Sequence, residues 1–342
     1  MKAFRLLILY PFSLLLSIIL TTRHKLYDWG VFKSCSFQVP TIVIGNLAIG
    51  GAGKSPMTEF LIRSLENNFK IAVLSRGYGR KTKGFRYVQT SDSSALCGDE
   101  PLQFKNKFPH TTIAVSENRC RGIEQIKGKH DLIILDDAYQ HRALQPKINI
   151  LLFEYSSLLQ PIRLFPSGRF RDLFSQTSRA DFIIVTKSPT IKDRREKEKI
   201  ERKLRGVNQH ASIFYASIKY HQLLNPEGIP FDAALDSFHV LAISGIANPK
   251  PFVADLKSKA ANLTSIAFPD HHNFTISDIQ KIRSAYHSIQ DENKIIVTTE
   301  KDFQRLPQDI MAELPVYFLP ISTDIEESNQ FLALLNKAIN KQ

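Results

Sequence analysis

The pattern of apolar positions predicts alternating strands and helices. Short apolar runs rich in β-branched residues alternate with segments in which apolar residues recur every three or four positions. Near-continuous apolar strands of this kind are typical of a parallel sheet that is covered by helices on both faces. The first set of expected strands comprises 40–45, 70–75, 111–115, 131–135, 148–153 and 181–186, and the alternating segment 212–220 is expected as a strand that leads out of the first domain.

A second set of apolar runs predicts a second, smaller α/β domain. The expected strands are 238–243, 294–298 and 315–319, with helical patterns between them. The highly charged stretch 191–205 favours a solvated helix over a binding patch, because opposite charges recur four residues apart. The expected division is 1–30 (N-terminal helix), 31–210 (first domain), 211–236 (linker strands) and 237–342 (second domain).

The N-terminal segment raises the question of membrane contact. Residues 6–20 read LLILYPFSLLLSIIL, with Arg5 before them and Arg23 and Lys25 after them. No small-residue cleavage site follows, and the run is shorter than the roughly 20 apolar residues of a spanning helix. Basic flanks suit a helix that dips into one leaflet, and a buried core helix is the alternative. We therefore expect a membrane-associated helix, with its depth in the bilayer left open.

A glycine-rich loop follows the first predicted strand. The sequence from Gly45 to Ser55 is GNLAIGGAGKS, and its end matches the phosphate-binding pattern G-x-x-x-x-G-K-[ST], although Ala48 takes the place of the first glycine. The helix that follows points its positive end at the loop. We expect Lys54 to contact the β- and γ-phosphates of a nucleotide. The predicted nucleotide-binding residues are Gly50, Gly51, Ala52, Gly53, Lys54, Ser55 and Pro56.

Two pairs of adjacent carboxylates are candidates for the chemistry. Asp136 and Asp137 follow an apolar strand, which is where the magnesium-binding aspartate of a P-loop enzyme lies, although a turn cap is the alternative. Asp99 and Glu100 precede Pro101. From spacing alone, that second pair is more typical of a helix N-terminus.

Composition narrows the class of partner. The chain has 342 residues, 43% of them hydrophobic and 23% charged, so it is long and apolar enough for two globular domains. Its net charge of +12 favours an acidic partner, which leaves nucleic acid, an anionic membrane and a phosphorylated substrate open. The three cysteines are widely spaced, so we expect neither a zinc ribbon nor a disulfide framework, as in a reducing cytosol.

Ten short segments follow one another in a characteristic order: 43–46, 50–55, 74–80, 98–101, 136–142, 165–169, 186–187, 245–249, 268–271 and 299–302. Each segment alone is weakly specific, but their order over nearly the whole chain, behind a membrane-seeking N-terminus, is specific. Together they resemble the tetraacyldisaccharide 4'-kinases of lipid A synthesis. Two departures from the family pattern are Ser55 in place of threonine and Ala138-Tyr139 in place of Gly-Phe.

The resemblance implies a fold, a reaction and a location. It implies two α/β/α domains, a P-loop NTPase-like core and a smaller one, with nucleotide in the cleft between them. The implied reaction uses ATP and Mg²⁺ to phosphorylate the 4'-hydroxyl of tetraacyldisaccharide 1-phosphate. The implied location is the cytoplasmic face of the bacterial inner membrane, where the N-terminal segment anchors the chain.

The resemblance also implies roles for individual residues. Asp99 matches the proposed general base and His271 the histidine that works with it, while Lys54 balances charge during transfer. Four residues are implied at the magnesium site: Ser55, Glu100, Asp136 and Asp137. Substrate contacts are expected from Arg76, Tyr78, Gln140, His141, Arg142 and Arg169.

The glycine-rich loop and the positive charge would each also fit another class of protein. A switch-type P-loop GTPase would read guanine with N/T-K-x-D, but the motif-like segment 186–189 is TKSP, with Pro189 where the aspartate would lie. A nucleic-acid-binding protein would fit the charge, but no helix-turn-helix, RNP or zinc-finger pattern is present. We therefore expect a glycolipid and a membrane surface as partners, no nucleic acid, and a monomer.

Overall fold

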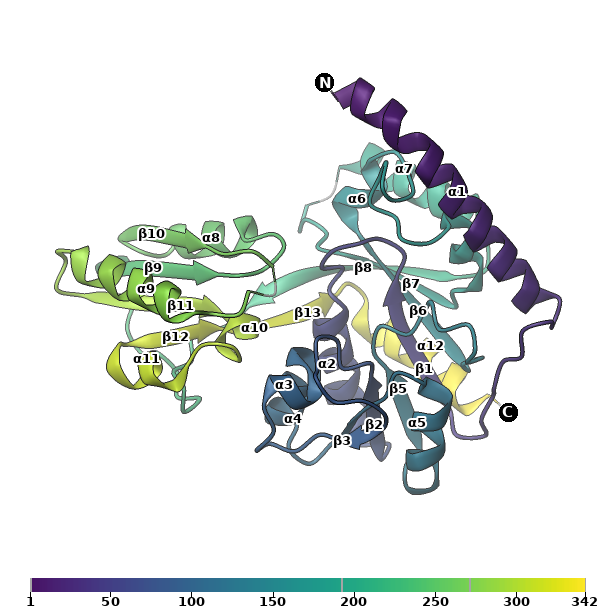
Figure 1. Cartoon of the computed structure of the whole chain (residues 1–342), viewed down its shortest axis with the longest axis horizontal. Helices are drawn as coiled ribbons and strands as arrows, with labels where there is room; N and C mark the ends of the chain where they lie inside the picture. The colour runs from purple at the N-terminus through teal and green to yellow at the C-terminus, as the bar shows by residue number, and fades with distance from the viewer. Residues whose placement is uncertain (1, 192, 271, 342) are drawn as a thin grey trace.

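The computed structural model describes residues 2–191, 193–270 and 272–341, which form two α/β domains (Figure 1). The first domain is built on a nine-stranded sheet with the order β13-β8-β7-β6-β1-β5-β2-β4-β3. Its interior strands are parallel, and only the edge strands β3 and β13 run antiparallel to their neighbours. The strands are β1 (Thr41–Asn46), β2 (Ile71–Ser75), β3 (Arg86–Tyr87), β4 (Thr112–Val115), β5 (Leu132–Leu135), β6 (Ile148–Glu154), β7 (Phe182–Thr186), β8 (Ser212–Tyr220) and β13 (Ile321–Ile325).

Helices cover both faces of this sheet, as the apolar runs predicted. Alternate residues of β1 point to opposite faces, so Ile42 and Ile44 join one buried cluster and Val43 joins the other. The first cluster contains residues of α2 (Lys54–Leu65), α4 (Asp99–Lys107) and α12 (Ser328–Asn340), and the second contains residues of α5 (Arg119–Ile126), α6 (Tyr155–Leu159) and α7 (Arg194–Arg205). Shorter elements are α3 (Ser94–Cys97), η1 (Lys127–Lys129) and η2 (Phe174–Arg179).

The second domain is a four-stranded parallel sheet with the order β10-β9-β11-β12. Its strands are β9 (His239–Ser244), β10 (Asn262–Ala267), β11 (Lys294–Thr299) and β12 (Val316–Leu319), and its helices are α8 (Lys250–Lys257), α9 (Ile276–Ser288), α10 (Glu300–Phe303), α11 (Gln308–Glu313) and the short η3 (Leu235–Ser237). The sequence predicted β9, β11 and β12 but not the edge strand β10. In β10 only Ile266 is buried, so no apolar run marks it.

The boundary between the domains differs from the predicted one. The expected second domain, 237–342, includes β13 and α12, which the structure places in the first domain. β13 pairs antiparallel with β8, and Phe331 of α12 packs in the same cluster as Ile42. Strand β8, expected as a linker, is a full member of the large sheet, and together β8 and β13 lead to the second domain (Figure 1). The return of the chain was missed because β13 reads ISTDI, in which three polar residues separate the two isoleucines and no apolar run marks a strand.

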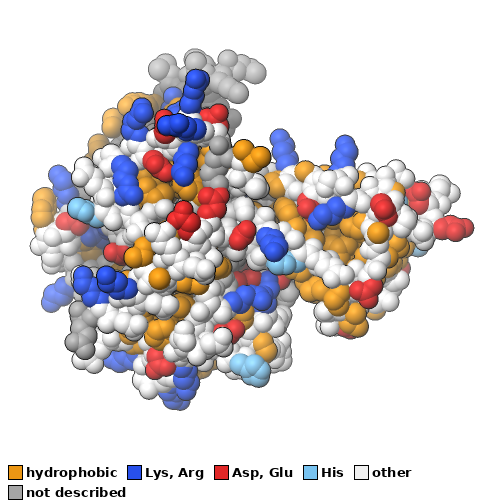
Figure 2. All heavy atoms as spheres, turned by 180° about the vertical axis from the view of Figure 1, so that it is seen from behind, with side chains coloured by type: hydrophobic (Ala, Val, Ile, Leu, Met, Phe, Trp, Pro, Cys, Tyr) orange, Lys and Arg blue, Asp and Glu red, His pale blue; other side chains and the backbone are white. Residues whose placement is uncertain are grey.

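Helix α1 (Lys2–Asp28) lies along the outside of the first domain, on the side away from the second domain (Figure 1). Its side chains from Ile8 to Ile19 are mostly exposed, and the large apolar ones among them are Ile8, Tyr10, Phe12, Leu14, Leu15, Ile18 and Ile19. No helix in the described ranges is both long and apolar enough to cross a bilayer. On the face shown in Figure 2, Lys and Arg side chains are interspersed with carboxylates over the first domain, so positive charge is spread over that surface.

The cysteines correct one expectation. A disulfide joins Cys35, in the segment between α1 and β1, to Cys120 in α5, although the sequence analysis expected no disulfide framework. The two residues are 85 positions apart, and the fold brings them together because residue 35 pairs with the 143–145 segment. Spacing along the chain contains no sign of that contact. Cys97 is a buried free thiol.

Candidate active site

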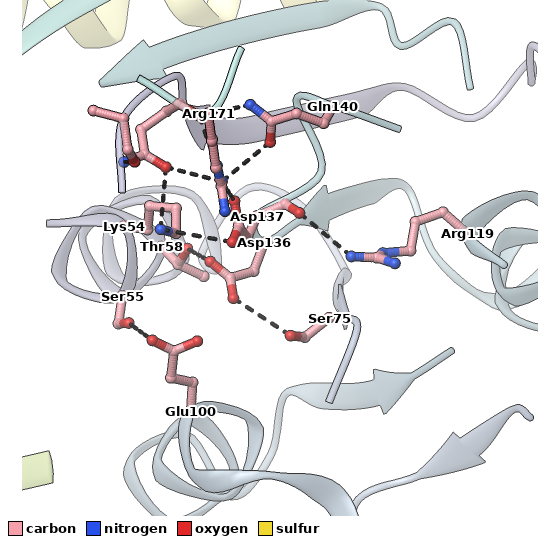
Figure 3. Close-up of polar contacts among 12 residues, drawn as sticks. Lys54, Ser55, Thr58, Ser75, Glu100, Arg119, Asp136, Asp137, Gln140 and Arg171 are labelled. Carbon is pink, nitrogen blue, oxygen red and sulfur yellow. Dashed lines mark hydrogen bonds and ion pairs between the residues drawn. The ribbon is translucent and has the colours of Figure 1, made fainter. Parts of the chain in front are cut away.

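The glycine-rich loop lies between β1 and α2, as its sequence predicted. Gly53 precedes α2 with φ +80°, a left-handed conformation that side chains other than glycine rarely adopt. Lys54 is the first residue of α2, and its Nζ atom lies 3.2 Å from Asn46 Oδ1 and 3.6 Å from the Asp137 carboxylate (Figure 3). The lysine therefore already faces the end of β5.

Asp136 follows β5 and is buried beneath the loop. Its carboxylate accepts hydrogen bonds from the hydroxyls of Thr58 and Ser75, both at the long distance of 3.4 Å (Figure 3). Burial, together with the nearby charges of Glu100 and Asp137, raises the pKa of Asp136 to about 7. Asp136 is thus a buried carboxylate with weak hydrogen-bond partners and too little positive charge around it.

Asp137 lies beside Asp136 but in a different electrostatic setting. Burial opposes its ionisation, but Lys54 and Arg171 outweigh that effect and lower the pKa of the Asp137 carboxyl. The Nη2 atom of Arg171 lies 2.5 Å from Asp137 Oδ1, 3.0 Å from Asn46 Oδ1 and 3.1 Å from Gln140 Oε1 (Figure 3). The sequence analysis missed Arg171, although it lies two residues after the matching segment 165–169.

The second acidic pair lies at the start of α4, as the sequence predicted, and reaches two other elements. Ser55 of α2 donates a hydrogen bond to Glu100 at 3.1 Å, which joins the two predicted magnesium residues (Figure 3). Asp99 accepts a hydrogen bond from Arg305 Nε at 2.8 Å. Arg305 belongs to the second domain, so Asp99 lies where the two domains meet. Nothing in the sequence motifs pointed to Arg305.

Cationic side chains surround the rim of the site. Burial lowers the pKa of Arg119 to about 10, although Asp136 opposes that change. Burial and the nearby charges of Arg119, Arg23 and Arg76 lower the pKa of His141 to about 4. His141 Nε2 is buried and has no hydrogen-bond partner within the described residues. His141 is therefore neutral near pH 7, whereas Arg119, whose Nη2 atom donates to the Asp137 carbonyl at 3.3 Å, places a positive charge where an anionic group would be favoured.

The other predicted substrate residues lie in different places. Gln140 donates to the carbonyl of Asn46, and Tyr78 is largely exposed. Arg169 lies against the glycine-rich loop, where its carbonyl accepts from the Ile49 amide at 2.7 Å. Arg142 instead donates to Asp28 of α1 at 2.7 Å. The substrate roles of all these residues stay predictions.

The remaining predicted residues are the histidine and the metal ligands. His271 lies outside the described residues, and its neighbour His272 bonds to Asp278 at 2.8 Å. Within 2–191, 193–270 and 272–341, no three His, Cys, Asp or Glu side chains converge as a complete metal-ligand set. Magnesium in kinase sites usually takes one or two carboxylates and completes its shell with phosphates and water. An incomplete set of protein ligands is therefore compatible with a magnesium site.

The comparisons with known proteins identify the family. The family model described as tetraacyldisaccharide-1-P 4'-kinase matches residues 5–340. The chain belongs to the tetraacyldisaccharide 4'-kinase family. The resemblance seen in the sequence motifs is thereby confirmed.

Relatives and a solved structure agree with this family. A tetraacyldisaccharide 4'-kinase of Bacteroides thetaiotaomicron is 39% identical, with 94% of this chain and 90% of that protein covered. One of Flavobacterium johnsoniae is 39% identical, with 95% and 94% covered. The crystal structure of LpxK from Aquifex aeolicus in complex with ATP matches with a TM-score of 0.75 at 30% identity, and covers 96% of this chain and 98% of that one.

Proposed function

We propose that this chain transfers the γ-phosphate of ATP to the 4'-hydroxyl of tetraacyldisaccharide 1-phosphate, and so makes the bis-phosphorylated lipid A precursor lipid IVA. One observation supports this most strongly: Lys54, the Asp136–Asp137 pair and the Ser55–Glu100 contact converge at one edge of the large sheet. In open α/β sheets this carboxyl edge is the usual place for nucleotide chemistry. The neighbouring Asp99 adds a group able to accept a proton.

The residues around the loop fit the phosphates of ATP. The amides of the loop and the N-terminus of α2 favour negative charge, and Lys54 adds a full positive charge. Lys54 lies within reach of Asn46 and Asp137, so it would contact the β- and γ-phosphates with only a small change of rotamer. The arrangement can bind and orient the triphosphate and stabilise charge on the transferring group.

The acidic residues fit a magnesium ion. Ser55 supplies a hydroxyl, and Glu100, Asp136 and Asp137 supply carboxylate oxygens, which are the ligand types that Mg²⁺ prefers. The raised pKa of Asp136 fits this assignment, because a divalent cation would relieve the crowding of negative charge around it. When bound, Mg²⁺ supplies neutralisation of the phosphate charge. The protein's own part is to hold these oxygens together next to Lys54.

Asp99 and the nearby arginines act on the lipid acceptor. Asp99 accepts the proton of the 4'-hydroxyl as that oxygen attacks the γ-phosphorus and the β–γ bridging bond breaks, which leaves ADP. His271 from the second domain works with Asp99. The positive charges of Arg76 and Arg119 favour the 1-phosphate of the lipid, and the neutral His141 beside them offers it a hydrogen bond. Arg305 Nε donates to Asp99 Oδ2 at 2.8 Å, and this contact holds the carboxylate of the proposed base in position.

The exposed apolar side chains of α1 support the membrane part of the proposal. Between Ile8 and Ile19 they present apolar surface that would be buried among lipid acyl chains, next to the first domain. The acyl chains of the substrate lie in the same layer. We propose that the enzyme works at the cytoplasmic face of the inner membrane, with α1 as its contact.

The test is phosphate transfer by the purified protein in detergent, with MgATP and tetraacyldisaccharide 1-phosphate. The variants are Lys54→Ala and Asp99→Ala, and the matched controls are Lys259→Ala and Asp255→Ala, an ion pair at the C-terminal end of α8 in the second domain. We expect each site variant to lower the rate at least about 100-fold. The two controls should stay near the wild-type rate.

Three results would change the proposal. If the wild type binds ATP but leaves the lipid unphosphorylated, the acceptor is wrong and a switch-type NTPase becomes the better reading. If Asp99→Ala keeps the wild-type rate, the kinase stands and its general base lies elsewhere. If Lys54→Ala keeps the wild-type rate, the glycine-rich loop is not the nucleotide site.

A further inference from the structure

Helix α1 is fastened to the first domain at two places of different character. Near its middle, Ser13 is buried and donates to the Leu164 carbonyl at 3.1 Å, and it lies 2.8 Å from the Ser167 hydroxyl. Near its C-terminal end, His24 is buried as well, and its Nε2 atom lies 2.7 Å from Asp172 Oδ1. The first contact involves a surface loop, whereas the second reaches toward the phosphate site.

The His24 contact fixes a buried carboxylate. The Nη1 atom of Arg142 lies 3.2 Å from His24 Nδ1, and a guanidinium can only donate, so Nδ1 accepts and Nε2 donates to Asp172. Asp172 is fully buried, and its Oδ2 atom has no hydrogen-bond partner among the described residues. His24 is therefore the side chain that holds this carboxylate in place, which matters because a buried charge without donors is strongly disfavoured.

The carboxylate adjoins the cation of the phosphate site. Asp172 is the next residue after Arg171, whose guanidinium contacts Asp137, Asn46 and Gln140 (Figure 3). The backbone amides of Arg171 and Asp172 both donate to the Leu47 carbonyl, at 2.8 and 3.3 Å, at the start of the glycine-rich loop. A shift of Asp172 would therefore move Arg171 relative to Asp137.

A second contact from α1 supports the other partner of Arg171. Arg23 donates to the Gln140 carbonyl at 2.8 Å, and the Gln140 side chain donates to the Asn46 carbonyl at 2.7 Å. Adjacent residues of α1 thus hold both Arg171, through Asp172, and Gln140. No comparable contact links Ser13 to these residues within the described part of the chain.

We propose that His24, with Arg23, is a positioning residue for phosphoryl transfer. Through these two residues, α1 holds the side chains of Arg171 and Gln140 in the correct position relative to Asp137. This inference rests on the proposed kinase function, and it assigns to the C-terminal end of α1 a part in the phosphate site beyond membrane contact. The same helix also presents apolar side chains outward. Membrane binding by α1 is therefore linked to the position of the Arg171 side chain.

The test compares His24→Gln with His24→Asn. The amide nitrogen of glutamine reaches the place of His24 Nε2 and keeps the donor for Asp172, whereas the shorter asparagine does not reach it. Ser13→Ala is the matched control, because it loosens the other contact of α1 and leaves Arg171 untouched. We expect His24→Asn to lower kcat about 10- to 100-fold with a much smaller change in KM for the lipid, and His24→Gln and Ser13→Ala to stay near wild type.

A second measurement does not depend on the activity. Hydrogen exchange of the Arg171 and Asp172 amides should be faster in His24→Asn than in the wild type, and unchanged in His24→Gln and Ser13→Ala. Equal exchange and equal kcat in His24→Asn and the wild type would overturn the proposal, as would a loss of kcat in Ser13→Ala of the same size. If the wild type phosphorylates no lipid, the proposed function fails, and the exchange comparison still decides whether His24 positions Arg171.

Discussion

Each domain buries an aspartate at the carboxyl end of a parallel strand, and the two aspartates differ in their partners. Asp136 follows β5 and accepts only long hydroxyl contacts of 3.4 Å, next to two other carboxylates. Asp302 follows β11 and accepts from the Gly245 amide at 2.8 Å, from the Thr299 hydroxyl at 2.7 Å and from Arg305 at 3.3 Å. Burial is the same, but only Asp302 is well hydrogen-bonded.

We interpret the difference as one between a structural carboxylate, Asp302, and a candidate functional one, Asp136. A buried carboxylate that is saturated with donors stabilises the fold around it. A buried carboxylate with weak donors and like charges nearby disfavours the folded state, and such groups gather at functional sites. Position at the end of a strand is therefore not enough to assign function, and the hydrogen bonds decide between the two roles.

The largest expected effect is on catalysis by Asp136. We expect Asp136→Asn to lower the rate of phosphate transfer about 10³-fold, because an amide provides neither the charge nor the oxygen pair for a metal–phosphate complex. The measurement is single-turnover transfer with saturating MgATP. A matched Asp302→Asn protein, assayed where it is fully folded, should lose less than about tenfold, and equal losses in both variants would remove the distinction drawn above.

The next effect is on stability and belongs to Asp302. We expect Asp302→Asn to lower the free energy of unfolding by about 2 kcal/mol, because Arg305 loses one of its two carboxylate partners and the Gly245 amide loses a strong acceptor. Chemical denaturation followed by circular dichroism measures this change. A loss below about 0.5 kcal/mol would show that the hydrogen bonds of Asp302 contribute little.

A smaller effect concerns the pH dependence of stability. The pKa of Asp136 is about 7 in the folded protein and about 3.9 in an unfolded chain, so between these values only the folded state holds the proton. Its contribution to stability is therefore present below about pH 4 and is lost as the pH rises through 7. The prediction concerns the Tm of the variant minus that of the wild type, measured without metal or nucleotide. As the pH rises from 5 to 8, this difference should increase by about 5 °C in favour of Asp136→Asn. Parallel Tm curves for the two proteins would argue against the raised pKa.

The smallest effect is expected at the hydroxyl of the loop. Ser55 stands where the family usually has threonine, and it donates to Glu100 through its hydroxyl. Ser55→Thr keeps that donor and should change the transfer rate by less than about threefold, whereas Ser55→Ala should lower it about 100-fold. Steady-state transfer rates of the two variants check this. Equal rates for Ser55→Ala and the wild type would exclude the hydroxyl from the metal site.

Much of the fold was predictable because its signals are local. Most strands of the large sheet are apolar runs, and the glycine-rich loop and Asp136 lie directly after two of them. Both features depend on residues that are neighbours in the sequence. The edge strands β3, β10 and β13 were not predicted, because partly exposed strands need no apolar run.

The rest of the site depends on contacts between distant parts of the chain. Arg305 reaches Asp99 across 206 positions, and His24 reaches Asp172 across 148. The Cys35–Cys120 disulfide is of the same kind. No spacing rule detects such pairs, because they arise only when sheets and helices have packed.

The most direct test of the distinction between Asp136 and Asp302 is the effect of Mg²⁺ on ATP binding. Isothermal titration would measure the affinity for ATP with and without Mg²⁺ in the wild type, Asp136→Asn and Asp302→Asn. We predict that Mg²⁺ strengthens ATP binding in the wild type and in Asp302→Asn, and that this gain is largely lost in Asp136→Asn. An Asp136→Asn protein with the full gain from Mg²⁺ would contradict the assignment of the buried, weakly bonded aspartate to the metal–nucleotide site.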